Sequence, residues 1–238
     1  LSNIADLAVA INGTDLKADQ INLYDLQGST IRIGMLNKND STDLSKLSWV
    51  DDTQKLNGSK FITTPYETTR YSVGSGYSKW YISVCRILTK SLGNSTGYIE
   101  VVKKCPSLFS PITNYVRSAD SPAEFYVFNK TGELIYPYDI SDEDKDKFSS
   151  YSSLLMLDNS NSIKDPVTGR QIRFARETSA YSGWTCLAIQ QDRVILRPVI
   201  SLTVILLIVV IVLLLLIVFL SYSLSKNMVK PVKHLKHI

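Results

Sequence analysis

Histidine, the side chain most often used as a general acid or base, occurs in this sequence only near the C-terminus. Both histidines, His234 and His237, lie there, and residues 1–198 contain none. Histidine-based acid–base or metal chemistry is therefore excluded for residues 1–198. The sequence also contains no glycine-rich phosphate loop, nucleophile elbow or metal-ligand cluster. We therefore expect no catalytic residue and no metal or cofactor site in these residues.

One acidic run offers oxygen ligands of the kind that calcium prefers. Its members are Asp142, Glu143, Asp144 and Asp146. Acidic side chains also stabilise the first turn of a helix, because they face its positive end. We favour this second interpretation and predict that a helix begins here.

Three cysteines, Cys85, Cys105 and Cys186, form an odd and widely spaced set. This number and spacing argue against a zinc site and against a fold held together by disulfides. One disulfide pair stays open from the sequence, and buried free thiols are the interpretation that we favour.

The longest apolar segment, VISLTVILLIVVIVLLLLIVFL, runs from Val199 to Leu220 without a charge. At about 1.5 Å per helical residue it would extend roughly 33 Å, enough to cross a ~30 Å hydrocarbon core. A buried helix of a soluble domain rarely stays apolar on every face over this length. We therefore predict a transmembrane helix over 199–220.

The charges on either side of this segment predict its orientation. Four lysines follow it without any acid, and lysine-rich flanks stay on the cytoplasmic side. The remaining 22 basic residues balance the 22 acids of residues 1–198, so this part is formally neutral. The +4 net charge is thus a property of the tail, and we predict no nucleic-acid binding. An exported segment also needs an earlier signal or membrane span, so we expect one upstream of Leu1.

The residues before the apolar segment are numerous enough to form a core, and their pattern predicts two modules of similar plan. Each contains two strands, a helix and an antiparallel hairpin. In the first module these elements are INLYDLQGSTIRIG (21–34), SKLSWVDDTQKLNG (45–58) and KWYISVCRIL with TGYIEVVKK (79–104). In the second they are AEFYVFNKTGELIYP (123–137), ISDEDKDKFSSYSSLLM (140–156) and GRQIRFARETSAYSGWTCLAIQQDRV (169–194).

These pieces, in this order before an apolar span, resemble the extracellular double Cache domains of bacterial sensor histidine kinases, particularly the YesM-like branch. The resemblance is carried by INLYDLQG, KWYISVCRIL with GYIEVVKK, FYVFNKTGELIYP and SGWTCLAIQQDRV. It implies an α+β fold with two PAS-like antiparallel sheets in series after a long N-terminal helix. The implied division is 1–105 for that helix and the membrane-distal module, 106–121 for a linker, 122–198 for the membrane-proximal module, 199–220 for the transmembrane helix and 221–238 for the start of a HAMP domain.

The segment after the span, SLSKNMVKPVKHL, looks like the opening of a HAMP domain. Met228, Val232 and Leu235 fall at heptad-like spacing for packing on a partner helix. A basic tail lying on anionic lipid is the alternative. The resemblance gives Pro231 a signalling position at the start of the first HAMP helix, and it implies a homodimer through the transmembrane and HAMP helices.

The resemblance also places a ligand in the first module, near the segment TTPYETTRYSVGSGYSKWY (63–81). Aromatic faces and cations there suit a carboxylate or a sugar. Strand alternation over Trp80–Leu88 must nevertheless send half of the side chains into the core. Relatives that bind amino acids carry an arginine two residues before a Trp-Tyr pair, where this chain has Ser78, so amino-acid recognition is in doubt. The candidate ligand-binding residues are Tyr66, Arg70, Tyr71, Tyr77, Trp80, Tyr81 and Arg86.

The resemblance implies the sensing part of a two-component histidine kinase in a bacterial cell membrane, with residues 1–198 extracellular and the C-terminus cytoplasmic. Its partners would be a small molecule or a binding protein outside the cell, and a response regulator reached through a kinase domain that uses ATP and Mg²⁺. No such catalytic domain lies within these residues. A methyl-accepting chemoreceptor, a diguanylate cyclase and a membrane-anchored interaction module remain alternatives.

Overall fold

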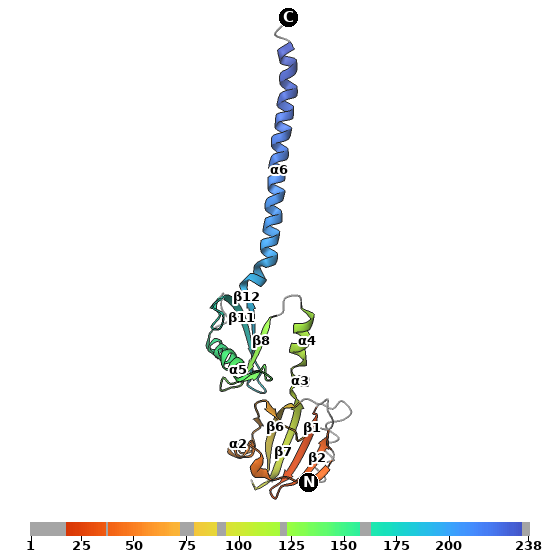
Figure 1. Ribbon diagram of the computed structural model, residues 1–238, viewed down its shortest axis with the longest axis vertical. Coiled ribbons are helices and arrows are strands. Elements are labelled where there is room, and N and C mark those ends of the chain that lie inside the picture. The colour runs from red at the N-terminus through yellow and green to blue at the C-terminus, as the bar shows by residue number, and fades with distance from the viewer. Residues whose placement is uncertain are drawn as a thin grey trace.

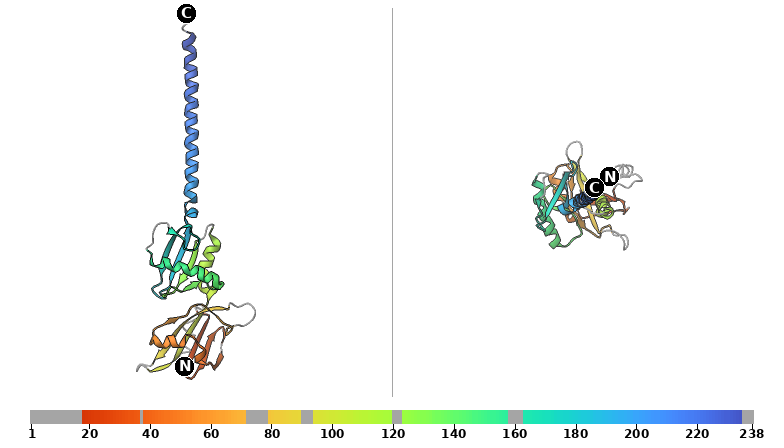
Figure 2. Two further views of the ribbon diagram at one scale, coloured as in Figure 1. Left: turned by 60° about the vertical axis from the view of Figure 1, so that its left-hand side comes forward. Right: turned by 90° about the horizontal axis from the view of Figure 1, so that it is seen from above.

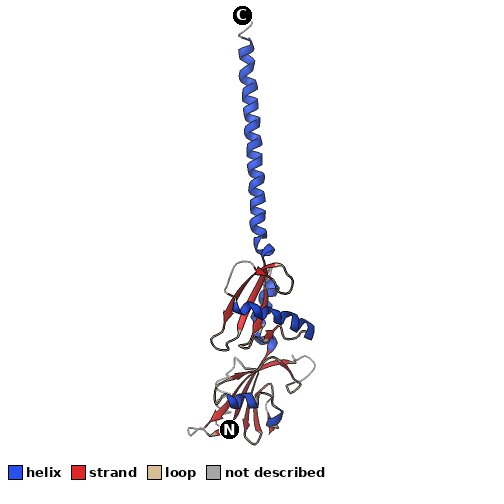
Figure 3. Ribbon diagram, turned by 90° about the vertical axis from the view of Figure 1, so that its left-hand side faces the viewer, coloured by secondary structure: helices blue, strands red, loops and turns tan. Residues whose placement is uncertain are grey.

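The computed structural model describes residues 18–36, 38–71, 79–89, 94–119, 123–157 and 163–234. The chain forms two antiparallel sheets that follow one another along its long axis, and one long helix extends beyond the second sheet (Figures 1 and 2). We call residues 18–104 the first module and residues 123–191 the second module. Helices lie against the strands of each module (Figure 3).

The sheet of the first module has seven strands in the order β3-β2-β1-β7-β6-β4, and β5 also pairs with β6. Its strands are β1 (Gln20–Asp25), β2 (Ser29–Gly34), β3 (Lys38–Ser41), β4 (Phe61–Ile62), β5 (Tyr66–Glu67), β6 (Trp80–Thr89) and β7 (Ser95–Lys104). The predicted turn between β1 and β2 contains Gly28 at φ +88°. Only glycine fits there, because a Cβ would lie 2.3 Å from the Thr42 carbonyl oxygen.

The two faces of this sheet have different composition, because successive side chains of a strand point to opposite sides. Asn22 on β1, Glu100 on β7 and Cys85 on β6 are register partners and therefore share one face. The other face is aliphatic and includes Ile21 packed with Ile33. The polar face is the one that can bind a polar ligand.

The polar face is covered by the 3₁₀ helix η1 (Leu44–Lys46) and by α2 (Val50–Lys55). The sequence predicted one helix here, and the structure has two short ones separated by Leu47–Trp49. Leu47 and Trp49 are both buried in the core. The turn between the two helices directs both side chains into it. Just after α2 the chain takes a left-handed conformation, with φ +44° at Asn57.

Two short helices, α3 (Cys105–Leu108) and α4 (Ser110–Ser118), follow β7 and lead to the second module. The second sheet has the order β10-β11-β12-β8-β9. Its strands are β8 (Glu124–Phe128), β9 (Leu134–Tyr136), β10 (Ile163–Lys164), β11 (Gln171–Thr178) and β12 (Thr185–Gln191).

Helix α5 (Asp142–Ser149) and the 3₁₀ helix η2 (Ser150–Met156) pack on the second sheet through a core that includes Tyr126, Tyr151 and Leu187. The acidic run forms the first turn of α5, and the Ser141 hydroxyl accepts a hydrogen bond of 3.1 Å from the Asp144 amide. The helical interpretation of the acidic run is confirmed.

A separate hydrophobic cluster joins the two modules. Phe109, which follows α3, stacks on Tyr138 of the second module at a ring-centroid distance of 5.7 Å. Trp80 of β6 also approaches the Tyr138 ring, at 6.0 Å. Ile82 and Ile135 are buried in the same cluster. The modules are therefore joined by packed side chains as well as by the chain itself.

Helix α6 (Asp192–His234) begins directly after β12 and contains the apolar segment (Figure 1). It is long and apolar enough to cross a membrane, and no residue in its most apolar window is buried against the rest of the chain. Pro231 lies within this same helix. The predicted α+β fold with two antiparallel sheets and a long C-terminal helix is confirmed, whereas the predicted N-terminal helix lies outside the described residues.

Candidate ligand-binding site

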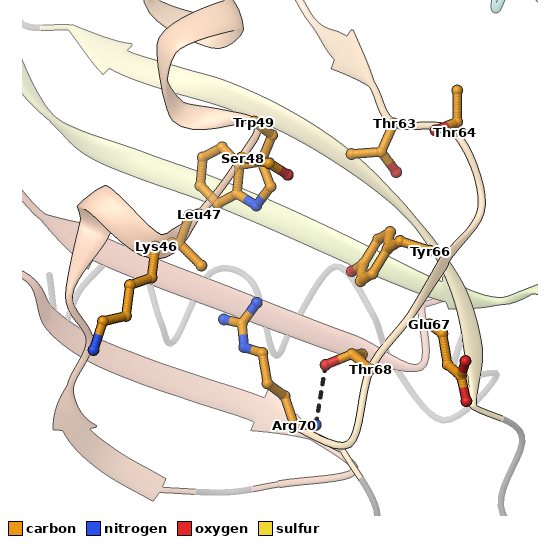
Figure 4. A pocket seen from close by; sticks show the side chains of 10 residues that line it. All are labelled: Lys46, Leu47, Ser48, Trp49, Thr63, Thr64, Tyr66, Glu67, Thr68 and Arg70. Carbon is orange, nitrogen blue, oxygen red and sulfur yellow. Dashed lines mark hydrogen bonds between the residues drawn. The ribbon is translucent and has the colours of Figure 1, made fainter.

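The polar face of the first sheet contains a cavity of about 210 Å³. Figure 4 shows that the Trp49 indole nitrogen, the Arg70 guanidinium and the Tyr66 hydroxyl point toward its centre, whereas Lys46 and Glu67 point away from it. The cavity is lined by Lys46, Leu47, Ser48, Trp49, Thr63, Thr64, Tyr66, Glu67, Thr68 and Arg70.

Backbone pairing to β6 holds one wall of the cavity, residues 63–68. The Thr63 amide donates to the Ser83 carbonyl at 2.9 Å, and the Ser83 amide donates back to the Thr63 hydroxyl at 2.9 Å. Tyr66 pairs with Tyr81 within β5 and β6. Because β5 has only two residues, this wall is a short ribbon attached along one edge.

Behind two residues that line the cavity, Tyr66 and Arg70, lies a fully buried carboxylate, that of Glu100. Its oxygens accept hydrogen bonds from the Tyr24 hydroxyl at 2.6 Å, the Asn22 side-chain amide at 2.8 Å and the Ser83 hydroxyl at 3.0 Å. Longer contacts of 3.4 Å come from the Tyr66 and Tyr71 hydroxyls. A buried charge is costly unless it is hydrogen-bonded, and this set of donors satisfies it.

The surrounding phenols remain protonated donors. Burial and the nearby Glu100 charge raise the pKa of Tyr24, Tyr66 and Tyr71 well above the ordinary value. The network therefore presents hydroxyl hydrogens to Glu100 throughout the physiological pH range. Its geometry is fixed before any ligand arrives.

Arg70 connects this network to the cavity. Its Nη2 donates to the Tyr24 hydroxyl at 3.0 Å and lies 3.9 Å from the nearer Glu100 oxygen. Burial opposes the charge on Arg70, but Tyr71, Tyr24 and Glu100 outweigh it and raise the pKa of the guanidinium above its usual range. The side chain is 29% exposed, so its remaining N–H groups can reach a ligand.

Trp49 contributes a second donor. Its ring packs against Tyr24 at a centroid distance of 5.7 Å and against Tyr98 at 5.9 Å. The residue is 4% exposed, and among the described residues its indole nitrogen has no hydrogen-bond partner. A cation and a neutral N–H therefore face the same cavity, an arrangement suited to binding an oxygen acceptor.

The structure brings four of the seven predicted residues together at this site. Tyr66 and Arg70 line the cavity. Tyr71 and Tyr81 lie beneath it, fully buried, with their rings 5.2 Å apart. These two tyrosines therefore support the cavity from the core. For Tyr81 this agrees with strand alternation, which sends half of the side chains of its strand into the core.

Two predicted residues lie elsewhere. Trp80 is on the opposite face of β6 from Tyr81 and packs against Tyr138 of the second module, so it does not line this cavity, and its role in ligand binding stays a prediction. Arg86 is exposed, its Nε donates to the Gly58 carbonyl, and it does not line this cavity, so its role in ligand binding also stays a prediction. Tyr77 lies outside the described residues.

Sequence reasoning missed Trp49 and Glu100. Trp49 lies in a segment predicted as continuous helix, whose pattern shows no break at Leu47–Trp49. Glu100 carried a visible signal, because it is a charged residue in the middle of an apolar strand. Within the part of the chain that the structure describes, no group of three or more His, Cys, Asp or Glu side chains could hold a metal ion. Cys85, Cys105 and Cys186 are all free thiols.

No protein-family model and no curated protein matches the chain. Solved structures do resemble it. The ligand-binding domain of the Campylobacter jejuni chemoreceptor Tlp3 with 4-methylisoleucine has a TM-score of 0.53 at 14% identity, covering 82% of this chain and 73% of that one. That of the Pseudomonas fluorescens chemoreceptor CtaA with L-serine has a TM-score of 0.52 at 15% identity, covering 79% and 80%.

The ligand-binding domain of Mlp24 with asparagine is a further neighbour, with a TM-score of 0.50 at 16% identity, covering 81% of this chain and 77% of that one. At such identities the likeness establishes the fold and nothing finer. The chain therefore shares the two-module α+β fold of these ligand-binding domains.

Proposed function

We propose that this chain is the ligand-sensing and membrane-spanning part of a bacterial receptor, and that the cavity of the first module binds a small molecule bearing a carboxylate. The observation that carries this proposal is the Arg70 guanidinium, which faces the cavity and is held from behind by Tyr24 and Glu100. A guanidinium fixed in this way is preorganised for a carboxylate. Neighbouring folds hold asparagine and L-serine, which supports an amino acid as the ligand.

We propose further that α6 crosses the membrane with both modules outside the cell. The uncharged apolar segment 199–220 of this helix and the lysines that follow the segment support this orientation. A homodimer through α6 and a HAMP domain beginning near residue 221 are parts of the same proposal, supported by the sequence resemblance.

Two kinds of cytoplasmic signalling domain are equally compatible with this sensing part. The resemblance to YesM-like proteins favours a sensor histidine kinase, with a kinase domain that uses ATP and Mg²⁺ and a response regulator as partner. The structural neighbours are chemoreceptors and favour a methyl-accepting output. The coding sequence beyond Ile238 would distinguish the two outputs.

The binding proposal is tested with the whole chain in lipid nanodiscs. Isothermal titration calorimetry would be performed with each of the twenty L-amino acids and with acetate and lactate. We expect at least one of these compounds to bind, and we expect Arg70→Ala to weaken that binding about 100-fold or more, as for a charged hydrogen-bonded pair that loses one partner.

Arg86→Ala is the matched control, because Arg86 is exposed and away from the cavity. Its affinity should stay within about twofold of the original chain. Equal losses in Arg70→Ala and Arg86→Ala would show that the cavity is not the binding site. A chain that binds none of the compounds would contradict the choice of a carboxylate ligand.

A further inference from the structure

Resting on the function proposed above, we propose that Trp49 is a specificity-determining residue whose indole N–H donates a hydrogen bond to the same ligand group that Arg70 binds. The ligand would then be selected for two acceptor oxygens on one planar group. This assigns to α2 and the residue before it a role in recognition that the candidate set from the sequence did not include.

The first argument is the condition of the indole nitrogen. Trp49 is 4% exposed, and its Nε1 is buried without an acceptor among the described residues. Buried N–H groups are almost always paired, because leaving one unpaired costs free energy. Figure 4 shows this nitrogen pointing into the cavity, so an acceptor placed there would satisfy it.

The second argument is that the same side chain positions both donors. The Tyr24 ring packs against the Trp49 ring at 5.7 Å, and the Tyr24 hydroxyl accepts from Arg70 at 3.0 Å. Tyr24 is itself fixed by its 2.6 Å hydrogen bond to Glu100. Both donors therefore contact Tyr24, which holds the Trp49 ring and the Arg70 guanidinium in a fixed relative position for a ligand.

The chemistry of the donors sets the selectivity. A carboxylate offers an oxygen to each donor and a negative charge to Arg70. A carboxamide offers one oxygen, and its NH₂ group would face the second N–H with no acceptor between them. A binding site discriminates strongly against an analogue whose binding would leave one of the site's buried polar groups without a hydrogen bond. The cavity should therefore reject amides of the acids that it binds.

The test uses ¹⁵N-labelled full-length chain in nanodiscs and follows the indole N–H resonances of its three tryptophans. Trp49→Phe assigns the Trp49 signal, and Trp184→Phe is the matched control in the other module. L-serine, L-isoleucine and L-asparagine are titrated beside their carboxamides. We expect the Trp49 signal to move on saturation with an acid that binds.

Trp49→Phe should weaken binding of the acid about 10- to 100-fold, as for one hydrogen bond to a charged group, and should reduce the preference for acid over amide. Circular dichroism checks that this variant remains folded. A wild-type chain that binds an acid with an unmoved Trp49 signal, and a Trp49→Phe chain that keeps its affinity within twofold, would overturn this inference and leave the proposed function intact. Binding of none of the acids would overturn both.

Discussion

At the scale of single residues, the unusual feature is a carboxylate in the middle of a sheet. Glu100 has no exposed surface, and hydrogen bonds from Asn22, Tyr24 and Ser83 replace the water that it loses. This arrangement fixes the Tyr24 hydroxyl, and through it the Arg70 guanidinium. The buried acid therefore positions Arg70 through Tyr24.

Replacing Glu100 by glutamine should destabilise the first module by about 2–4 kcal/mol, because several buried donors lose a charged acceptor. Urea unfolding followed by near-ultraviolet circular dichroism of the tyrosines measures this change. Glu67→Gln is the control, since Glu67 is exposed and lies 3.8 Å from an exposed Lys79. It should change stability by less than about 0.5 kcal/mol. Equal losses of stability in the two variants would show that the Glu100 carboxylate does not stabilise the first module.

The second module should weaken in acid through Asp165. Burial alone would raise the pKa of this carboxyl, but hydrogen bonds from Thr168, Val167 and Tyr151 outweigh burial and hold the pKa below its unfolded value of 3.8. A depressed pKa contributes stability that is complete above the unfolded value and is lost as the pH falls through the folded value.

Asp165→Asn should therefore destabilise β11 and β12 by roughly 1–2 kcal/mol at neutral pH, and the difference from the original chain should shrink as the pH falls below 3.8 through the lowered folded-state pKa. Hydrogen exchange of the amides in these strands at several pH values measures the loss of stability at neutral pH and its dependence on pH. A difference that does not change with pH would mean that the ionised carboxylate has no special role.

Residue types predicted part of the site and missed the rest for a physical reason. Tyr66 and Arg70 stand in the segment near which the resemblance places a ligand, and their side chains suit a carboxylate. The role of Glu100 depends on Asn22 and Tyr24, which lie 78 and 76 positions away, and no local pattern contains such contacts. The position of Trp49 depends on a turn that the helical pattern of its neighbours conceals.

At the scale of elements, residues 63–68 and Trp80 connect the cavity to the second module. Thr64 lines the ligand cavity and also a smaller cavity of about 100 Å³ between the modules, next to Trp80 and Tyr138. Glu67 pairs with Trp80 in the sheet. Residues 63–68 therefore contact both the cavity and the packing between the modules.

The junction between β12 and α6 is the next element in this series. Asp192 is the first residue of α6, and its carboxylate lies 2.9 Å from Arg173 Nε on β11. The helix therefore leaves the sheet with no loop between them. This direct connection is what a rigid coupling between the sheet and the helix requires.

Inserting Gly-Ser-Gly-Ser between Asp192 and Pro198 should abolish ligand-dependent output of the full-length receptor, because a flexible linker absorbs the displacement. Ligand affinity measured by calorimetry should stay within about twofold, since the cavity is untouched. An insertion of four alanines keeps helical continuity and is the matched control. Unchanged signalling by the Gly/Ser variant would rule out a rigid β12–α6 connection.

The sequence predicted the order of strands and helices well, but it predicted their boundaries less well. Alternating strands, the Gly28 turn and the acid-started helix α5 follow from local pattern and are present. The split between η1 and α2 is not local, because burial of Leu47 and Trp49 against Tyr24 and Cys85 decides it.

At the scale of the whole molecule, the order of parts forms one continuous path. The ligand cavity lies in the first module, a hydrophobic cluster around Phe109 and Tyr138 joins it to the second module, and α6 continues from that module's sheet (Figure 1). Each part contacts the next through packed side chains or paired backbone. This arrangement supports a population shift in which a ligand favours one packing of the modules over another.

Hydrogen–deuterium exchange of the full chain in nanodiscs, with and without a saturating amino acid that binds, tests this account most directly. The account predicts slower exchange at residues 46–49 and 63–70, together with altered exchange at 134–140 and at the β12–α6 junction. Protection confined to the second module, or a change at the cavity with none at the junction, would contradict it.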